Sequence, residues 1–223
     1  MMVTFFVAFL LNIIAYAQVS GEIEYGVRYT GMLADTSKIT DRTQLSKVIQ
    51  LENEAKAGLA FDETYCVLRF EGSNSYFKKV PKMELDNHIG NFYIGWGGYL
   101  KINNKLYEEN GFNKQSYYVD VTVNPNWKLK NEYCTFLGYK CQKAEATINW
   151  RGELRKLIAW FTTKIPVSVG PYYSYGLPGL ILAMEYKGRF HYARKINLNK
   201  DVNIEIPEKK YLITRDEYFN LYD

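Results

Sequence analysis

Short segments in which apolar and polar residues alternate follow one another along most of the chain, and this pattern constrains the fold most strongly. The clearest runs from Glu22 to Thr30, where Ile23, Tyr25, Val27 and Tyr29 would share one face. Similar extended segments are expected at 64–71, 75–80, 99–107, 115–123, 127–136, 139–148, 154–163, 180–186 and 190–198. Such a succession predicts a mainly β fold, an antiparallel meander whose sheet is curved or partly closed, like half a barrel.

Turn-forming residues predict where the chain reverses between these segments. Gly72-Ser73-Asn74 and the stretch from Glu185 to Arg189 predict two hairpin turns. Asn110-Gly111, in the loop 108–111, predicts a third, because Asn and Gly tolerate the positive φ of tight turns. Strands do not alternate with helices, so a parallel sheet of the Rossmann or TIM-barrel type is not expected.

One early segment, Asp41 to Ala57, has the pattern of a helix. Thr40 or Asp41 can cap its N-terminus, Leu45, Val48 and Ile49 form an apolar stripe, and Gly58 ends it. We expect this helix to pack across the sheet.

The N-terminal residues have the layout of a secretory signal peptide. An apolar run from Phe5 to Ile14 is followed by Ala15-Tyr16-Ala17, a typical cleavage site, although Met1 to Thr4 contain no Lys or Arg. The alternative is an ordinary apolar strand or helix. Gln18 follows instead of Cys, so a lipid anchor is not expected. We therefore predict a signal peptide over 1–17, a single β-rich domain over 18–223, and a periplasmic or secreted location.

The mature chain would keep three cysteines, Cys66, Cys134 and Cys141, which in an oxidising compartment indicates one disulfide and one free thiol. If Leu137-Gly138 is a two-residue turn, Cys134 and Cys141 lie opposite each other. Neighbours at the closer, non-hydrogen-bonded cross-strand sites have separations suited to a disulfide. The alternative is that both are small apolar strand residues. With two histidines and no Cys-x-x-Cys pair, neither a metal nor another cofactor is predicted.

The most distinctive segment follows Trp160 and contains regularly placed Pro and Gly. Pro166 is expected to end a strand, and Gly170-Pro171 to restart the chain, with Gly170 adopting a φ that other residues avoid. In Gly176-Leu177-Pro178-Gly179, the order Pro then Gly is typical of a type II turn with positive φ at Gly179. The turn would lead into a buried strand that begins at Leu180-Ile181. The alternative is that it closes the rim of an apolar cleft.

These blocks, together with residues 137–144, make the chain resemble the GLPGLI family of exported Bacteroidetes proteins. The resemblance is close over 137–186 and looser before it, and Phe161 stands where the family more often has Tyr. It implies export and a β-rich build, with this block as the signature of the fold. It implies no reaction, cofactor or catalytic residue.

Catalytic candidates are few. His88 and His191 lie in no nucleophile motif, and Cys66 lies in an apolar strand, where a thiol is unreactive. A carboxylate pair such as Glu145 and Glu185 has no spacing signature. The net charge of +4 does not indicate nucleic acid.

Three hypotheses for function follow. The first is a non-catalytic binding or chaperone-like module of the cell envelope, whose apolar concavity would hold a lipid, a peptide or an envelope partner. The second is a hydrolase acting on glycans or peptides with a carboxylate pair, whose sugar-stacking aromatics would be among Trp96, Trp127, Trp150 and Trp160. The third is a structural subunit of an outer-membrane assembly. The sequence does not predict the oligomeric state.

Overall fold

The computed structural model describes residues 19–30, 39–58, 66–80, 97–150 and 152–222. The predicted signal peptide, His88 and Trp96 lie outside these residues, and the predictions made for them are neither confirmed nor contradicted. The elements in chain order are β1 Ser20–Tyr29, α1 Arg42–Gly58, β2 Cys66–Glu71, β3 Asn74–Lys79, β4 Tyr99–Ile102, β5 Lys105–Phe112, β6 Gln115–Asp120, β7 Lys128–Phe136, β8 Tyr139–Trp150, β9 Glu153–Thr162, β10 Leu180–Tyr186, β11 Arg189–Leu198, η2 Lys209–Tyr211, β12 Leu212–Ile213 and α3 Arg215–Phe219.

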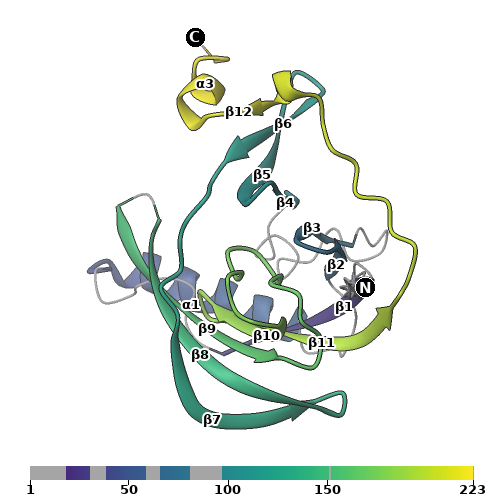
Figure 1. The fold of residues 1–223 in the computed structure, drawn as a ribbon. Coiled ribbons are helices and arrows are strands. Elements are labelled where there is room, and N and C mark those ends of the chain that lie inside the picture. The colour runs from purple at the N-terminus through teal and green to yellow at the C-terminus, as the bar shows by residue number, and fades with distance from the viewer. Residues whose placement is uncertain (1–18, 31–38, 59–65, 81–96, 151, 223) are drawn as a thin grey trace, which may run out of the picture.

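The described strands form one twelve-stranded sheet in the order β12-β6-β5-β4-β3-β2-β1-β11-β10-β9-β8-β7. It consists of two antiparallel meanders, β2 to β6 and β7 to β11, and β1 pairs with β2 on one side and β11 on the other. Among the described strands, only the pairing of β12 with β6 is parallel. The sheet curves strongly but stays open (Figure 1). The predicted mainly β meander is confirmed.

Of the four turns predicted between neighbouring strands, three are confirmed and one is wrong. Two-residue turns at Gly72-Ser73, Leu137-Gly138 and Lys187-Gly188 join paired strands, and positive φ values at Leu137 and Lys187 mark the last two. Asn110-Gly111, in contrast, lies inside β5 and pairs with β6. The chain reverses instead at Asn103-Asn104 and Asn113-Lys114, where all four residues have positive φ. Asn tolerates this conformation, so Asn103, Asn104 and Asn113 were turn signals as well.

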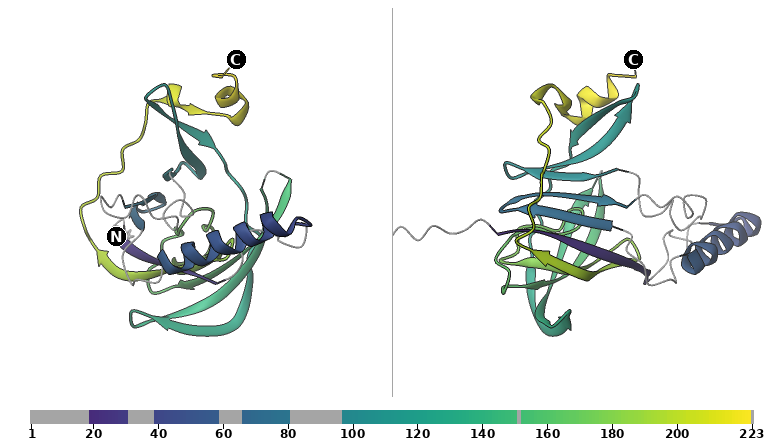
Figure 2. Two further views of the ribbon diagram at one scale, coloured as in Figure 1. Left: turned by 180° about the vertical axis from the view of Figure 1, so that it is seen from behind. Right: turned by 90° about the vertical axis from the view of Figure 1, so that its right-hand side faces the viewer.

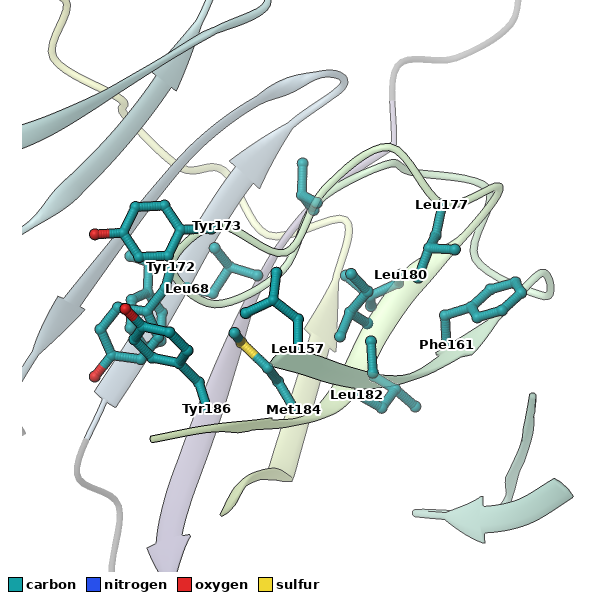
Figure 3. Packing of buried hydrophobic residues seen from close by; sticks show 14 of the residues in the cluster. Leu68, Leu157, Phe161, Tyr172, Tyr173, Leu177, Leu180, Leu182, Met184 and Tyr186 are labelled. Carbon is teal, nitrogen blue, oxygen red and sulfur yellow. The ribbon is translucent and has the colours of Figure 1, made fainter. Parts of the chain in front are cut away.

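The loop between β9 and β10, residues 163–179, lies against the concave face of the sheet; we call it the core loop. Ile165, Val169, Tyr173 and Leu177 of this loop are at most 2% exposed and belong to the main apolar core. Figure 3 shows Tyr173 beside Tyr186, and Leu177 near Leu180. The loop therefore supplies the interior that a helix layer or second sheet supplies in other folds.

Hydrogen bonds satisfy the backbone of the core loop as it crosses the interior. The N–H of Leu180 donates to the carbonyl of Ile165 at 2.9 Å, and that of Ile181 to the carbonyl of Val169 at 3.1 Å. The indole of Trp127 donates to the carbonyl of Tyr175 at 2.7 Å. Since an unpaired buried backbone group is costly, these bonds make the buried loop stable.

Gly170 and Gly179 serve a different purpose from the one predicted. Positive φ occurs at Gly176, at +87°, and not at Gly170 or Gly179, so the predicted type II turn is wrong. A Cβ at Gly179 would lie 2.1 Å from the carbonyl oxygen of Thr162. Gly179 is therefore required by close backbone approach. Gly170 has the same role, because a Cβ there would lie 2.7 Å from the carbonyl oxygen of Ser174.

The early helix is confirmed as α1, but its expected packing is not. The Asp41 carboxylate accepts hydrogen bonds from the N–H groups of Thr43 and Gln44 at 2.7 and 3.0 Å, which confirms it as the cap. The apolar stripe is not covered by the residues that the structure describes: Leu45 is half-buried and Ile49 is 42% exposed. In Figure 2, α1 lies beyond the strand ends and not across a face of the sheet.

The chain crosses the convex face after β11 as an extended segment, residues 199–208, which we call the strap. Ile204 of the strap packs on a second apolar cluster of Leu100, Ile102 and Tyr107, on the face opposite the core loop. Beyond the strap, β12 pairs with β6, and α3 begins with a capping box between Thr214 and Glu217.

The cysteine hairpin has the predicted pairing, with Cys134 directly opposite Cys141. Counted from the two-residue turn, the pair falls at a hydrogen-bonded site and not at the closer kind of site expected. Cα atoms at such sites are about 5.5 Å apart, which a disulfide can span. All three cysteines are free thiols in the structure, so the disulfide stays a prediction for the oxidised protein.

We predict that the oxidised protein contains the Cys134–Cys141 disulfide and that Cys66 remains a thiol. Cys66 is 0% exposed, and burial raises its pKa to about 12, so it should react with iodoacetamide only after denaturation. Peptide mapping without reductant, with labelling before and after unfolding, measures both. A disulfide that includes Cys66, or labelling of Cys66 in the folded protein, would contradict this assignment.

Gly179→Ala should lower the free energy of unfolding by about 1–3 kcal/mol or more, because the new methyl group collides with the backbone of Thr162. Gly111→Ala is the matched control, since a Cβ there meets nothing within 4 Å. It should change stability by no more than about 0.5 kcal/mol. Urea unfolding followed by circular dichroism measures both. Equal stabilities of the two variants would mean that the close approach at Gly179 is not as described.

Candidate functional site

The concave side of the sheet, where the sequence suggested an apolar binding site, is occupied by the core loop. The tip of this loop is Tyr172, which has a φ of +50° and is 7% exposed. Its ring makes edge contacts with Phe77, Tyr99 and His191 at centroid distances of 4.8, 5.1 and 5.0 Å. A ligand-binding surface on the described part of the sheet must therefore be sought elsewhere.

The predicted motif residues are mostly part of this interior. Gly170, Pro171, Leu177, Gly179, Leu180 and Ile181 are buried, whereas Pro166, Gly176 and Pro178 are exposed. Pro166 does not end the strand, because β9 already ends at Thr162. Trp160 is half-buried on the convex face of the sheet, and the Lys143 ammonium lies 5.8 Å from the centroid of its ring.

His191, one of the described candidates for catalysis, is held in an unreactive environment. His191 is 1% exposed, and burial together with the charge of Arg189 lowers its pKa to about 3, so its imidazole is neutral at physiological pH. Its Nε2 atom lies 3.2 Å from the hydroxyl oxygen of Tyr172. Both groups are inside the protein, where His191 cannot reach a dissolved substrate.

The described ranges contain no group of three or more His, Cys, Asp or Glu side chains that could hold a metal ion. No helix within them is long and apolar enough to cross a bilayer.

A polar pocket of about 400 Å³ lies on the convex face, between β2 to β6 and the strap. We call it the tyrosine pocket. It is lined by Arg69, Tyr76, Lys78, Leu100, Glu109, Tyr118, Asn203 and Glu205. The two tyrosines provide ring surfaces, and the charged residues include two cations and two carboxylates.

Two hydroxyl groups hold Glu109 in the tyrosine pocket. Its carboxylate accepts a hydrogen bond from the Tyr76 hydroxyl at 2.5 Å and another from the Ser116 hydroxyl at 3.0 Å. Burial, the hydrogen bond to Glu109 and its negative charge raise the pKa of Tyr76 well above its usual range, so the phenol keeps its proton. Each carboxylate oxygen retains a lone pair for a ligand. Glu109 can therefore act as a fixed hydrogen-bond acceptor.

The strap is attached beside this pocket through Glu22 of β1. One carboxylate oxygen accepts from the Arg69 Nε at 2.8 Å, and the other from the Lys200 Nζ at 2.5 Å. Burial alone would raise the pKa of Glu22, but Lys200 and Arg69 outweigh it and hold the pKa below its ordinary value. The same carboxylate thus fixes both Arg69, in the pocket wall, and the start of the strap.

Sequence reasoning did not find the tyrosine pocket. Tyr76, Glu109 and Tyr118 are the solvent-side members of three strands and become neighbours only through the sheet register. The one local signal is alternation, which places Tyr76 and Lys78 on the same face of β3. No prediction was made from the sequence for the strap residues.

Comparisons with known proteins support the fold and give no activity. The sequence model of a family described as "Protein of unknown function (Porph_ging)" matches residues 150–183, which comprise β9, the core loop and the start of β10. This is part of the block on which the resemblance to the GLPGLI family rests, although the matching family has a different name. No curated protein matches.

Two solved structures of a protein named PNGF-II, in space groups P21 and C2, have a similar fold. Their TM-scores are 0.53 and 0.52, each at 15% sequence identity and covering 92% of this chain. The alignments cover 33% and 32% of the PNGF-II chains, so this chain spans about a third of their length. At this identity the likeness is one of fold alone.

Acid should weaken the attachment of the strap, because the pKa of Glu22 is lower in the folded protein than its ordinary value. Glu22 binds its proton more tightly in the unfolded chain than in the folded protein. The stabilisation that ionised Glu22 gives is therefore full above about pH 4.5 and is lost as the pH falls through the pKa of Glu22 in the folded protein. Glu22→Gln should lower the unfolding free energy by about 1–3 kcal/mol at neutral pH and make it less sensitive to acid. Urea unfolding across pH measures both. Glu71→Gln, at an exposed position of β2, should leave the acid sensitivity unchanged; an equal change in both variants would refute the role of Glu22.

Proposed function

We propose that this protein is an exported, non-catalytic binding module of the cell envelope that holds a polar peptide segment of a partner protein in the tyrosine pocket. The observation that carries the proposal is the pairing of a filled interior with a preorganised polar pocket outside it. An acyl chain would need apolar surface, and the concave face that could provide it is covered by the core loop. The pocket instead offers donors and acceptors of both charges.

The strap supports a peptide as the ligand. It is an extended segment that already lies on this face, with Ile204 in contact with the second apolar cluster and Lys200 bound to Glu22. An extended partner segment beside the strap could use the same combination of side-chain packing and ion pairing. Lys78 and Glu205 would pair with side chains of opposite charge, and Glu109 would accept a hydrogen bond.

The hydrolase alternative uses the same pocket, because Glu109 and Glu205 both line it. Under that alternative one carboxyl group must donate a proton. Both oxygens of Glu109 already accept a hydrogen bond, one from the Tyr76 hydroxyl and one from the Ser116 hydroxyl, and this acceptor geometry favours binding over catalysis. Cleavage of a captured peptide by the wild type, and not by Glu109→Gln, would support the hydrolase.

Charge reversal in the pocket tests the proposal. The mature chain would be crosslinked to envelope extracts, and captured peptides would be quantified by mass spectrometry. Lys78→Glu and Glu205→Lys should each reduce capture of the same partner several-fold, because each places a like charge against it. Lys47→Glu, on the exposed surface of α1, gives the same change in net charge as Lys78→Glu and should bind as the wild type does. A partner captured equally by all four proteins would overturn the assignment of the pocket.

A further inference from the structure

A second pocket on the convex face, of about 360 Å³, lies over β7, β8 and β9. We call it the lysine pocket. It is lined by Asn126, Lys128, Lys130, Glu145, Ala146, Thr147 and Lys156. Lys143 lies at the border of the pocket and contacts Glu145. The lysine pocket shares no residue with the tyrosine pocket.

Glu145 is the centre of this pocket and contacts three lysines. Its carboxylate oxygens lie 3.6 Å from the Nζ of Lys130, 3.4 Å from that of Lys143 and 3.5 Å from that of Lys156. Lys128 is directly opposite Glu145 in the register of β7 and β8. Three ammonium groups therefore contact one carboxylate, and a fourth lysine, Lys128, lines the same pocket.

These ion pairs leave positive charge unmatched. Only Glu132 adds a second carboxylate, 2.9 Å from the Nζ of Lys143, so the described group has four cations and two anions. Charge-assisted hydrogen bonds between an ammonium and a carboxylate are usually about 2.7–2.9 Å long. The longer contacts to Glu145 leave the ammonium groups of Lys130 and Lys156 able to donate to another acceptor.

The structure assigns the lysine pocket as a binding site for a phosphate monoester group. Such a group has a charge of about −1.5 to −2 near neutral pH, which matches the excess of two positive charges. Lysine binds phosphate as a point charge and does not need the planar fork of arginine. Thr147 and Asn126 add neutral donors at the pocket wall. The volume is within the range of small-molecule sites.

The fold holds these lysines in place through residues that the sequence analysis assigned otherwise. Lys143 pairs in register with Trp160 of β9, and its ammonium lies 5.8 Å from the ring centroid while it contacts Glu132 and Glu145. Trp160 therefore has a role on the convex face in addition to its packing against the core. Lys156 is 61% exposed and remains accessible to a ligand.

Isothermal titration calorimetry with inorganic phosphate, at low ionic strength to limit screening, tests the assignment. Glu145→Gln should bind phosphate about two- to fivefold more tightly, because it removes the competing carboxylate, and Lys156→Gln should bind it more weakly by a similar factor. Lys105→Gln removes a lysine that pairs with Asp120 elsewhere on the sheet and should leave the dissociation constant unchanged. Lys156→Gln and Lys105→Gln change the net charge equally, so a loss of binding in the first and not in the second distinguishes a site from a general effect of charge.

A second arm identifies the source of the phosphate group. Phosphatidylcholine vesicles with and without phosphatidic acid would be sedimented with the wild type and the same three variants. Binding that requires phosphatidic acid and follows the order of the variants indicates a lipid headgroup, and phosphate binding without vesicle binding indicates a soluble monoester. Both support the site. Unchanged or weaker phosphate binding by Glu145→Gln, or equal losses in Lys156→Gln and Lys105→Gln, would overturn it.

Discussion

Gly179 lies so close to the backbone of Thr162 that no side chain fits between them, and this contact fixes where the core loop returns to the sheet. Thr162 ends β9, and β10 begins at Leu180. Because the chain enters and leaves the loop at the same point, the intervening residues can fold back over the concave face. The sheet is open, so without this loop its apolar concave face would be exposed to water. The core loop thus determines on which side of the sheet ligands can bind.

The sequence predicted the strands well because alternation is a local property. Ile23, Tyr25 and Val27 repeat at every second position and are at most 1% exposed. Turn positions were less certain because two kinds of dipeptide compete: Asn110-Gly111 and Asn103-Asn104 are both acceptable, and the sheet register decides between them. The role of Gly179 was misjudged for a related reason. Positive φ and close approach both require glycine, and only the fold shows which one applies.

Neither candidate pocket could be predicted, because each is assembled from separate strands. Tyr76 and Glu109 are joined by a hydrogen bond across three neighbouring strands, and Lys130 and Lys156 meet at Glu145 only because β8 lies between their strands. The chain has a modest net charge, and its lysines are not clustered in sequence. Pairing of strands converts that scattered charge into a local excess. Composition therefore excludes a uniformly basic surface, but it does not exclude a basic pocket.

The edges of the sheet explain why recognition should use its convex face. An edge strand can bind a partner by adding a strand, unless charges or irregularities oppose it. β7 has Lys128 and Lys130 on an exposed edge, and its pairing with β8 is interrupted between Leu129 and Tyr133. At the other edge β12 has only two residues. Both described edges are thus poor templates for strand addition, and the concave face is filled. The convex face is where side chains of the described strands can contact another molecule without disturbing the core.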